Sequence, residues 1–130
     1  MDIVRQVIVF DAPDLAVESA FWAAVLGGSV VPDDDDGWHS ILDAKGRWRM
    51  GIQLAPNHVS PDWPNGQQQV HLDLHVDGED AAQAAHDELM GLGARLLQDA
   101  DDRDGEEAPG GEGHRIYASP SGHPFCIGWH

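Results

Sequence analysis

Apolar residues come in short runs that alternate with longer stretches of helical spacing, and this pattern predicts strands and helices in a definite order. Residues 3–10 are mostly β-branched or apolar, which predicts a strand. Turn-prone residues follow, and Asp14 is suited to cap a helix. From Leu15 apolar side chains recur at helical spacing until Gly27 and Gly28, so we expect a helix that ends there.

Two more strands and a loop complete the first half of the chain. Residues 38–42 and 48–54 have strand composition, and residues 44–46 supply the turn of a hairpin between them. The acidic run 33–36 is interpreted as a solvated turn. Residues 56–68 hold three prolines, two asparagines and a glycine, which is typical of a loop.

The second half repeats the same plan. Residues 69–76 alternate as a strand does, an alanine-rich helix begins at Gly78, and Leu92-Gly93 ends it as Leu26-Gly27 ends the first. Further strands are predicted at 95–98, 114–118 and 124–129, with an acidic, glycine-rich loop at 99–113. Two similar halves joined by a proline-rich connector indicate an internal duplication.

Length and charge restrict the classes of protein that fit. A chain of 130 residues has the size of one domain. Its 7 basic and 23 acidic residues give a formal charge of -16, which disfavours nucleic acid and anionic membrane as partners. The single cysteine, Cys126, cannot form an internal disulfide, and we find neither a signal peptide nor a long apolar run. We therefore expect a cytoplasmic protein.

Several motifs, in this order, resemble those of the vicinal oxygen chelate superfamily, which includes glyoxalases, bleomycin-resistance proteins and extradiol dioxygenases. The motifs are Asp14-Leu15, Phe21-Trp22, Val25-Leu26-Gly27, Val70-His71-Leu72-Asp73-Leu74, Leu92-Gly93-Ala94 and Ser119-Pro120-Ser121-Gly122-His123-Pro124-Phe125. Together with the segment Asp62-Trp63-Pro64-Asn65-Gly66 they are most similar to the subgroup of glyoxalase-like domains.

The resemblance implies an α+β fold in which two tandem βαβββ modules form a curved eight-stranded mixed sheet around a central cavity. Residues 1–130 would then be one domain, with module one at 1–56, a connector at 57–68 and module two at 69–130. Because many relatives pair across a two-fold axis, the resemblance also implies a homodimer.

Metal-using members of the superfamily take one ligand from the first strand and one from the last strand of each module. The motifs place those four positions at Val7, Gln53, His71 and Cys126. Valine has no lone pair and an amide oxygen is a poor ligand, so we predict no metal or other cofactor. If a divalent ion (Zn, Fe, Ni or Mn) binds, His71 would hold it with Cys126 or Gln53.

Side chains on one strand suggest a second cluster. His71, Asp73 and His75 alternate and so share one face, where they either line a cavity through hydrogen bonds or hold zinc or iron. His71 or Asp73 could serve as a general acid or base. Cys126 is either a thiolate nucleophile beside His71 or a small hydrophobic residue of the core.

Other aromatic and imidazole groups carry weaker expectations. One or two of four tryptophans could stack on a flat ligand, although packing or a dimer contact would also explain them: Trp38, Trp48, Trp63 and Trp129. His86, in the second helix, and His114, near a strand end, are expected to be exposed.

Three functions remain open on this basis. The first is a metal-independent binder of a small organic molecule, with a cavity lined by Val7, Gln53, His71, Asp73, His75 and Cys126. The alternative is a lyase, isomerase or dioxygenase that uses an ion or His71 alone for proton transfer. The third is a structural or regulatory dimer module without an open cavity.

Overall fold

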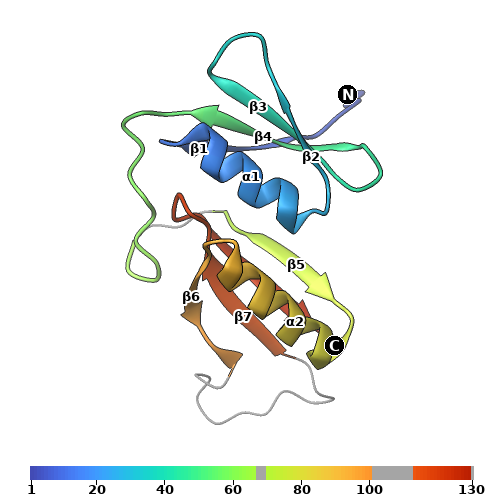
Figure 1. Cartoon of the computed structure of the whole chain (residues 1–130), viewed down its shortest axis with the longest axis vertical. Coiled ribbons are helices and arrows are strands. Elements are labelled where there is room, and N and C mark those ends of the chain that lie inside the picture. Colours follow the sequence, from blue (N-terminus) through green and yellow to red (C-terminus); the bar gives the residue numbers. More distant parts are fainter. Residues whose placement is uncertain (67–69, 101–112, 130) are drawn as a thin grey trace. The chain divides into compact units, whose positions relative to one another are not determined.

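A computed structural model describes residues 1–66, 70–100 and 113–129 of the chain. In these ranges the chain forms two helices and eight strands, and its contacts divide it into two compact units, Met1–Val59 and Ser60–His130 (Figure 1). Each unit is described by itself. Neither helix in the described ranges is long and apolar enough to cross a membrane.

The first unit follows the order strand, helix, three strands. Its elements are β1 (Ile8–Ala12), α1 (Leu15–Val25), β2 (Ser29–Pro32), β3 (Trp38–Leu42) and β4 (Trp48–Leu54). The sheet order is β1-β4-β3-β2, with β1 parallel to β4 and the other two pairs antiparallel. Helix α1 packs on one face of this sheet, against β2, β3 and β4.

The second unit repeats this arrangement element by element. It contains β5 (Leu72–Val76), α2 (Gly78–Gly91), β6 (Arg95–Gln98), β7 (Gly113–Ala118) and β8 (Pro124–Trp129). Its sheet order is β5-β8-β7-β6, with β5 parallel to β8. Helix α2 packs on this sheet and contacts β8. The predicted α+β class with two tandem βαβββ modules is therefore confirmed.

Local signals in the sequence account for the bounds of the helices. The Asp14 side chain accepts a hydrogen bond of 3.1 Å from the backbone N–H of Val17 and so caps α1. Gly27 and Gly93 follow the two helices with φ of 63° and 96°, a conformation that glycine adopts without strain.

The first strand differs from its prediction. It was expected at residues 3–10, but β1 runs from Ile8 to Ala12, so Asp11 and Ala12 belong to the sheet and not to a turn. The parallel ladder with β4 decides these bounds, because it pairs Ile8 with Met50 at one end and Ala12 with Leu54 at the other. Ala12 is consequently buried among the sheet residues.

Other bounds depend on similar pairing. β2 was not assigned from composition, yet it forms because residues 29–32 pair with β3. β5 begins at Leu72, three residues later than expected; residue 69 of the predicted strand lies outside the described ranges, as do residues 67–68 of the predicted connector and 101–112 of the predicted acidic loop.

Candidate functional site

Strand register determines which side chains lie on the face of the second sheet away from α2, which we call the open face of unit two. The parallel ladder pairs Asp73 with Cys126 and His75 with Gly128. The alternate residues of β8, Phe125, Ile127 and Trp129, are buried on the face of the sheet that α2 covers. Since alternate residues point to opposite faces, Asp73, His75 and Cys126 share the open face.

The Asp73 carboxylate and the His75 imidazole form a pair on this face. His75 Nε2 lies 3.2 Å from Asp73 Oδ2, and their side chains are 53% and 58% exposed. In the neutral imidazole, Nε2–H donates to the carboxylate and Nδ1 keeps its lone pair. The His75 ring also lies close over Gly128, because a Cβ on that glycine would be 3.0 Å from Cε1. The ring therefore has a defined position.

The Cys126 thiol lies directly across from Asp73. Burial raises the pKa of Cys126, and the negative charge of Asp73 raises it further. A raised pKa keeps the sulfur protonated at neutral pH, so Cys126 is a weak hydrogen-bond donor here and a poor nucleophile. This favours the interpretation of Cys126 as a small hydrophobic residue over the thiolate.

Sequence-predicted residues outside this cluster have different settings. Gln53 is exposed in β4, where its neighbours in register are Asp11 of β1 and Trp38 of β3. Val7 immediately precedes β1 and is half-buried, and His71 immediately precedes β5 and is exposed. Unit two thus brings together Asp73, His75 and Cys126, while Val7 and Gln53 belong to unit one.

The four positions that would hold the superfamily's ion do not form a good donor set. Val7 offers no donor atom and Gln53 offers a neutral amide, which leaves His71 and Cys126 as the two positions with good donor atoms. Within the described ranges, no three His, Cys, Asp or Glu side chains are arranged to hold a metal ion. Two good donors among four positions are a poor match to the four ligands that metal-using members of the superfamily supply.

Two tryptophans that were candidates for ligand stacking instead cover glycines. A Cβ on Gly51 would lie 2.1 Å from the Trp38 ring, and one on Gly113 would lie 2.2 Å from the Trp129 ring. Trp38 Nε1 donates to Ser40 Oγ over 3.0 Å. One face of each indole ring therefore packs on the backbone of a glycine, in agreement with a packing role for these two tryptophans.

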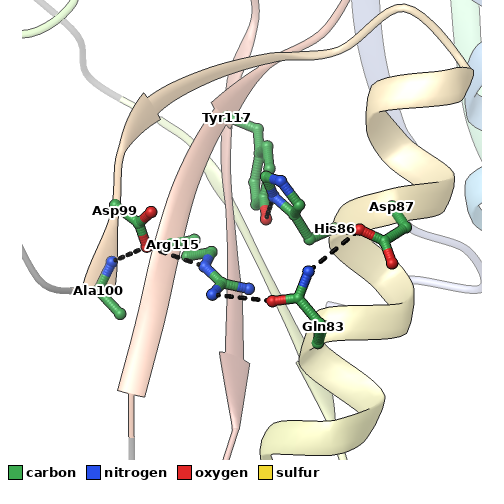
Figure 2. A network of polar contacts seen from close by, with 7 residues as sticks. All are labelled: Gln83, His86, Asp87, Asp99, Ala100, Arg115 and Tyr117. Carbon is green, nitrogen blue, oxygen red and sulfur yellow. Dashed lines mark hydrogen bonds and ion pairs between the residues drawn. The ribbon is translucent and has the colours of Figure 1, made fainter.

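Sequence reasoning missed a polar network between α2 and its sheet (Figure 2). Arg115 of β7 donates to Asp99 over 3.0 Å and to Gln83 of α2 over 3.3 Å. Gln83 in turn donates to Asp87 over 3.0 Å. The i, i+4 spacing of Gln83 and Asp87 was a visible signal. The link to β7 required knowledge of the fold.

A second contact joins the same helix and strand. His86 Nδ1 lies 3.0 Å from the hydroxyl of Tyr117, whose side chain is fully buried (Figure 2). The expectation that His86 is exposed is wrong, because the imidazole is half-buried against β7. His114 is likewise half-buried and not exposed, since β7 begins one residue before it and pairs with β8 there.

Asp99→Asn is expected to change the pH dependence of stability. The hydrogen bond from Arg115 holds the pKa of the Asp99 carboxyl below its usual value. Such a group stabilises the fold above its unfolded pKa and loses that contribution as the pH falls through its folded pKa. At pH 7 the free energy of unfolding of the variant should be lower by less than about 1 kcal/mol, because the Arg115–Asp99 pair is partly exposed. The usual pKa of aspartate is about 4, and well below that pH the difference between the two proteins should vanish.

Urea denaturation at a series of pH values measures this effect. Arg115→Gln serves as the matched control, and the double variant should lose little more than either single variant if the two side chains act as a pair. A deficit in Asp99→Asn that stays constant from neutral to strongly acidic pH would contradict the assignment.

Comparison with known proteins adds to this geometry. The family described as glyoxalase-like domain matches residues 7–128. No curated protein matches the chain at a significant level. Among solved structures, a fosfomycin resistance protein, FosX, from Listeria monocytogenes is similar, with a TM-score of 0.71 at 13% identity over 100% of this chain and 93% of that one.

Two other solved structures show the same fold. A glyoxalase/bleomycin resistance protein/dioxygenase family enzyme from Burkholderia phytofirmans PsJN has a TM-score of 0.67 at 15% identity, covering 94% of both chains. A FosX variant complexed with Mn(II) and 1S,2S-dihydroxypropylphosphonic acid has a TM-score of 0.67 at 14% identity, covering 98% of this chain and 90% of that one. With the family match over nearly its whole length, the chain belongs to the glyoxalase-like domain family of the vicinal oxygen chelate superfamily.

Proposed function

We propose that this protein binds a small organic molecule without using the superfamily's metal site. The observation that carries the proposal is the open face of unit two, where Asp73, His75 and Cys126 lie together on adjacent strands and α2 covers the opposite face. Polar groups that share a face left uncovered by α2, the helix in the described part of unit two, suit the polar part of a ligand site.

These groups define what a ligand must offer. The Asp73 carboxylate accepts hydrogen bonds, the His75 imidazole can donate or accept, and the protonated thiol of Cys126 adds a soft, weakly polar surface. The predicted site also includes Gln53, an amide that both donates and accepts, together with Val7 and His71. A ligand with at least one donor and one acceptor beside an apolar body suits this set.

The alternative is an enzyme of the superfamily in which an imidazole transfers a proton. The Asp73–His75 pair favours it, because a carboxylate that orients an imidazole is a recurrent arrangement in acid–base catalysis. His71 and Asp73 were the predicted catalytic residues. Catalysis would require a bound substrate to reach this face, so binding is the first property to test.

Thermal denaturation in the presence of candidate ligands tests the proposal. The panel includes carboxylic acids, phosphonates, amines and aromatic compounds, and also fosfomycin, because the structurally similar FosX is described as a fosfomycin resistance protein. A ligand at a hundred times its Kd stabilises the folded state by about 2.7 kcal/mol and raises the Tm accordingly. We expect at least one compound to do so.

Variants then locate the site. Asp73→Asn and Cys126→Leu should weaken binding of that compound about tenfold, the effect of losing roughly 1.4 kcal/mol. Met90→Leu, on the exposed side of α2, should bind as the unmodified chain does. If no compound of a broad panel raises the Tm, or if binding is indifferent to both variants, the proposal fails and a structural module becomes the better interpretation.

Oligomeric state and location belong to the same proposal. We expect a homodimer in the cytoplasm, on the resemblance and on the sequence features given above. The charge of -16 continues to disfavour nucleic acid as a partner. Sedimentation velocity at micromolar concentration measures the oligomeric state directly.

A further inference from the structure

A tryptophan lies on the sheet face of unit one that is opposite to α1, which we call the open face of unit one. Helix α1 packs on the other face, where Ser19 Oγ and His39 Nδ1 of β3 lie 2.9 Å apart. Because alternate residues of a strand point to opposite faces, Trp38 and Ser40, on either side of His39, share the open face. Ser40 pairs with Gly51 of β4, so that glycine belongs to the same face.

The indole of Trp38 has a defined position there. It lies over the bare backbone of Gly51, because a Cβ on that glycine would be 2.1 Å from Cζ2 and 2.3 Å from Cη2. Its Nε1–H donates to Ser40 Oγ over 3.0 Å. These contacts use one face and one edge of the ring, and the side chain as a whole is half-buried. The indole is therefore a flat apolar surface that is already held in place.

Exposed apolar side chains border this indole. One row of register partners crosses all four strands and consists of Val9, Gly51, Ser40 and Val31. Val9 of β1 and Val31 of β2, at its two ends, are 43% and 46% exposed. With the Trp38 ring over the middle of the row, these side chains form an apolar strip across the sheet. Contiguous exposed apolar surface marks an interaction site more often than single exposed residues do.

A polar margin follows the strip. Gln53 pairs with Trp38 on one side and with Asp11 of β1 on the other. Directly opposite residues of antiparallel strands have Cβ atoms about 4.5–5.5 Å apart, so the Gln53 side chain is a neighbour of the indole. Gln53 is exposed, and its amide has both donor and acceptor atoms. The Asp11 carboxylate and the net charge of -16 disfavour an anion at this margin.

We propose that the open face of unit one binds a planar aromatic molecule that stacks on the face of Trp38 away from Gly51 and presents a neutral donor–acceptor group to Gln53. Aromatic rings gain from offset stacking beyond the apolar area that they bury, so a flat ligand suits this strip better than a saturated one. The inference goes beyond the function proposed above, because it concerns the other unit and uses only Gln53 of the predicted cavity residues.

Titration of the isotope-labelled full chain with β-naphthamide, followed by NMR of the indole N–H groups, tests the proposal. The decahydro derivative of this compound keeps the carboxamide but is not flat. We expect a saturable shift of the Trp38 signal, which is identified by its loss in Trp38→Phe. The decahydro derivative should bind about two- to tenfold more weakly, the worth of one aromatic pair. The anion of β-naphthoic acid should also bind more weakly than the amide.

Variants locate the ligand on this face. Trp38→Leu still covers Gly51 but has no flat ring, and should weaken β-naphthamide binding about two- to tenfold. Gln53→Leu removes the amide and should have an effect of about the same size. Gly51→Ala keeps the indole but displaces it, because the methyl group would meet the ring at 2.1 Å, so binding should weaken. Trp48→Leu is the matched control in the same strand: Trp48 Nε1 donates to the Met50 carbonyl, and the variant should bind as the unmodified chain does.

Circular dichroism and the Tm of each variant establish that it is folded, and Trp38→Met replaces Trp38→Leu if the latter is not. Three results would overturn the proposal: no saturable shift of the Trp38 signal, equal affinity for the flat and the saturated compound, or a changed oligomeric state in Trp38→Leu with unchanged binding. The last would assign this face to an interface between two copies of the chain. A compound whose binding depends on Asp73 and Cys126 would support the function proposed for unit two in any of these cases, so the two proposals can fail separately.

Discussion

Replacing Trp22 by alanine is expected to lower the free energy of unfolding of unit one by about 3–5 kcal/mol, the range for removing a large aromatic side chain from a core. Trp22 is 0% exposed, and its ring centroid lies 5.2 Å from those of Phe10 and Phe21. Its Nε1–H also donates to the Glu18 carboxylate over 2.9 Å, and that carboxylate is itself fully buried. The substitution therefore creates a cavity and removes a hydrogen-bond donor from a buried carboxyl group.

Two further variants separate these effects. Trp22→Phe retains most of the ring packing but not the donor, and should cost about 1–3 kcal/mol for the lost hydrogen bond to a buried polar group. Glu18→Gln alone keeps an acceptor oxygen for the Trp22 N–H, so it should cost less than Trp22→Phe. Urea denaturation followed by fluorescence and circular dichroism gives the values. A cost for Trp22→Ala near that of a surface substitution would contradict the packing described here.

Gly28→Ala should be nearly as damaging although it adds only a methyl group. A Cβ at this position would lie 1.7 Å from the carbonyl oxygen and 2.6 Å from the carbonyl carbon of Leu42. Both atoms are backbone, so no side chain can rotate away, and the end of β3 must move. We expect a loss of about 3 kcal/mol or more, at or above the upper end of the usual cost of overpacking.

Substitution of a second glycine serves as a control, because it should not lower the free energy of unfolding. Gly91, the last residue of α2, has no atom within 4 Å of a Cβ built on it. Gly91→Ala should therefore be neutral or stabilise the chain by up to about 1 kcal/mol, because alanine favours the helix over glycine. Thermal denaturation of the two variants side by side makes the comparison. Equal effects would show that the contact with Leu42 does not govern the cost at Gly28.

Local signals in the sequence were sufficient for the helices and for several strands. Asp14 and the glycines after each helix mark their bounds through interactions of a few neighbouring residues, and β3, β4, β6 and β8 have the predicted bounds. Where local preference and pairing between strands conflict, the pairing determines the bounds of the strand. Asp11 has turn chemistry, yet pairing with Gln53 places it in β1.

The candidate site could be predicted only within one strand. Alternation predicts one face for His71, Asp73 and His75, and β5 has Asp73 and His75 on one face because period two is a local property, while His71 lies before the strand. The pairing of His114 with Gly128, and the reach of Arg115 to Asp99 and Gln83, depend on register between segments far apart in the sequence. A single sequence does not contain that register, so His114 was misjudged and Arg115 was overlooked.

The first and last strands of each unit lie side by side, β1 with β4 and β5 with β8. During synthesis most of a module therefore leaves the ribosome before the last strand, which pairs with the first. Until then the apolar side of the helix cannot pack on the complete sheet. Closing so long a loop is entropically slow. Each half of this duplicated chain is consequently expected to assemble late in its own synthesis, as a unit and not strand by strand.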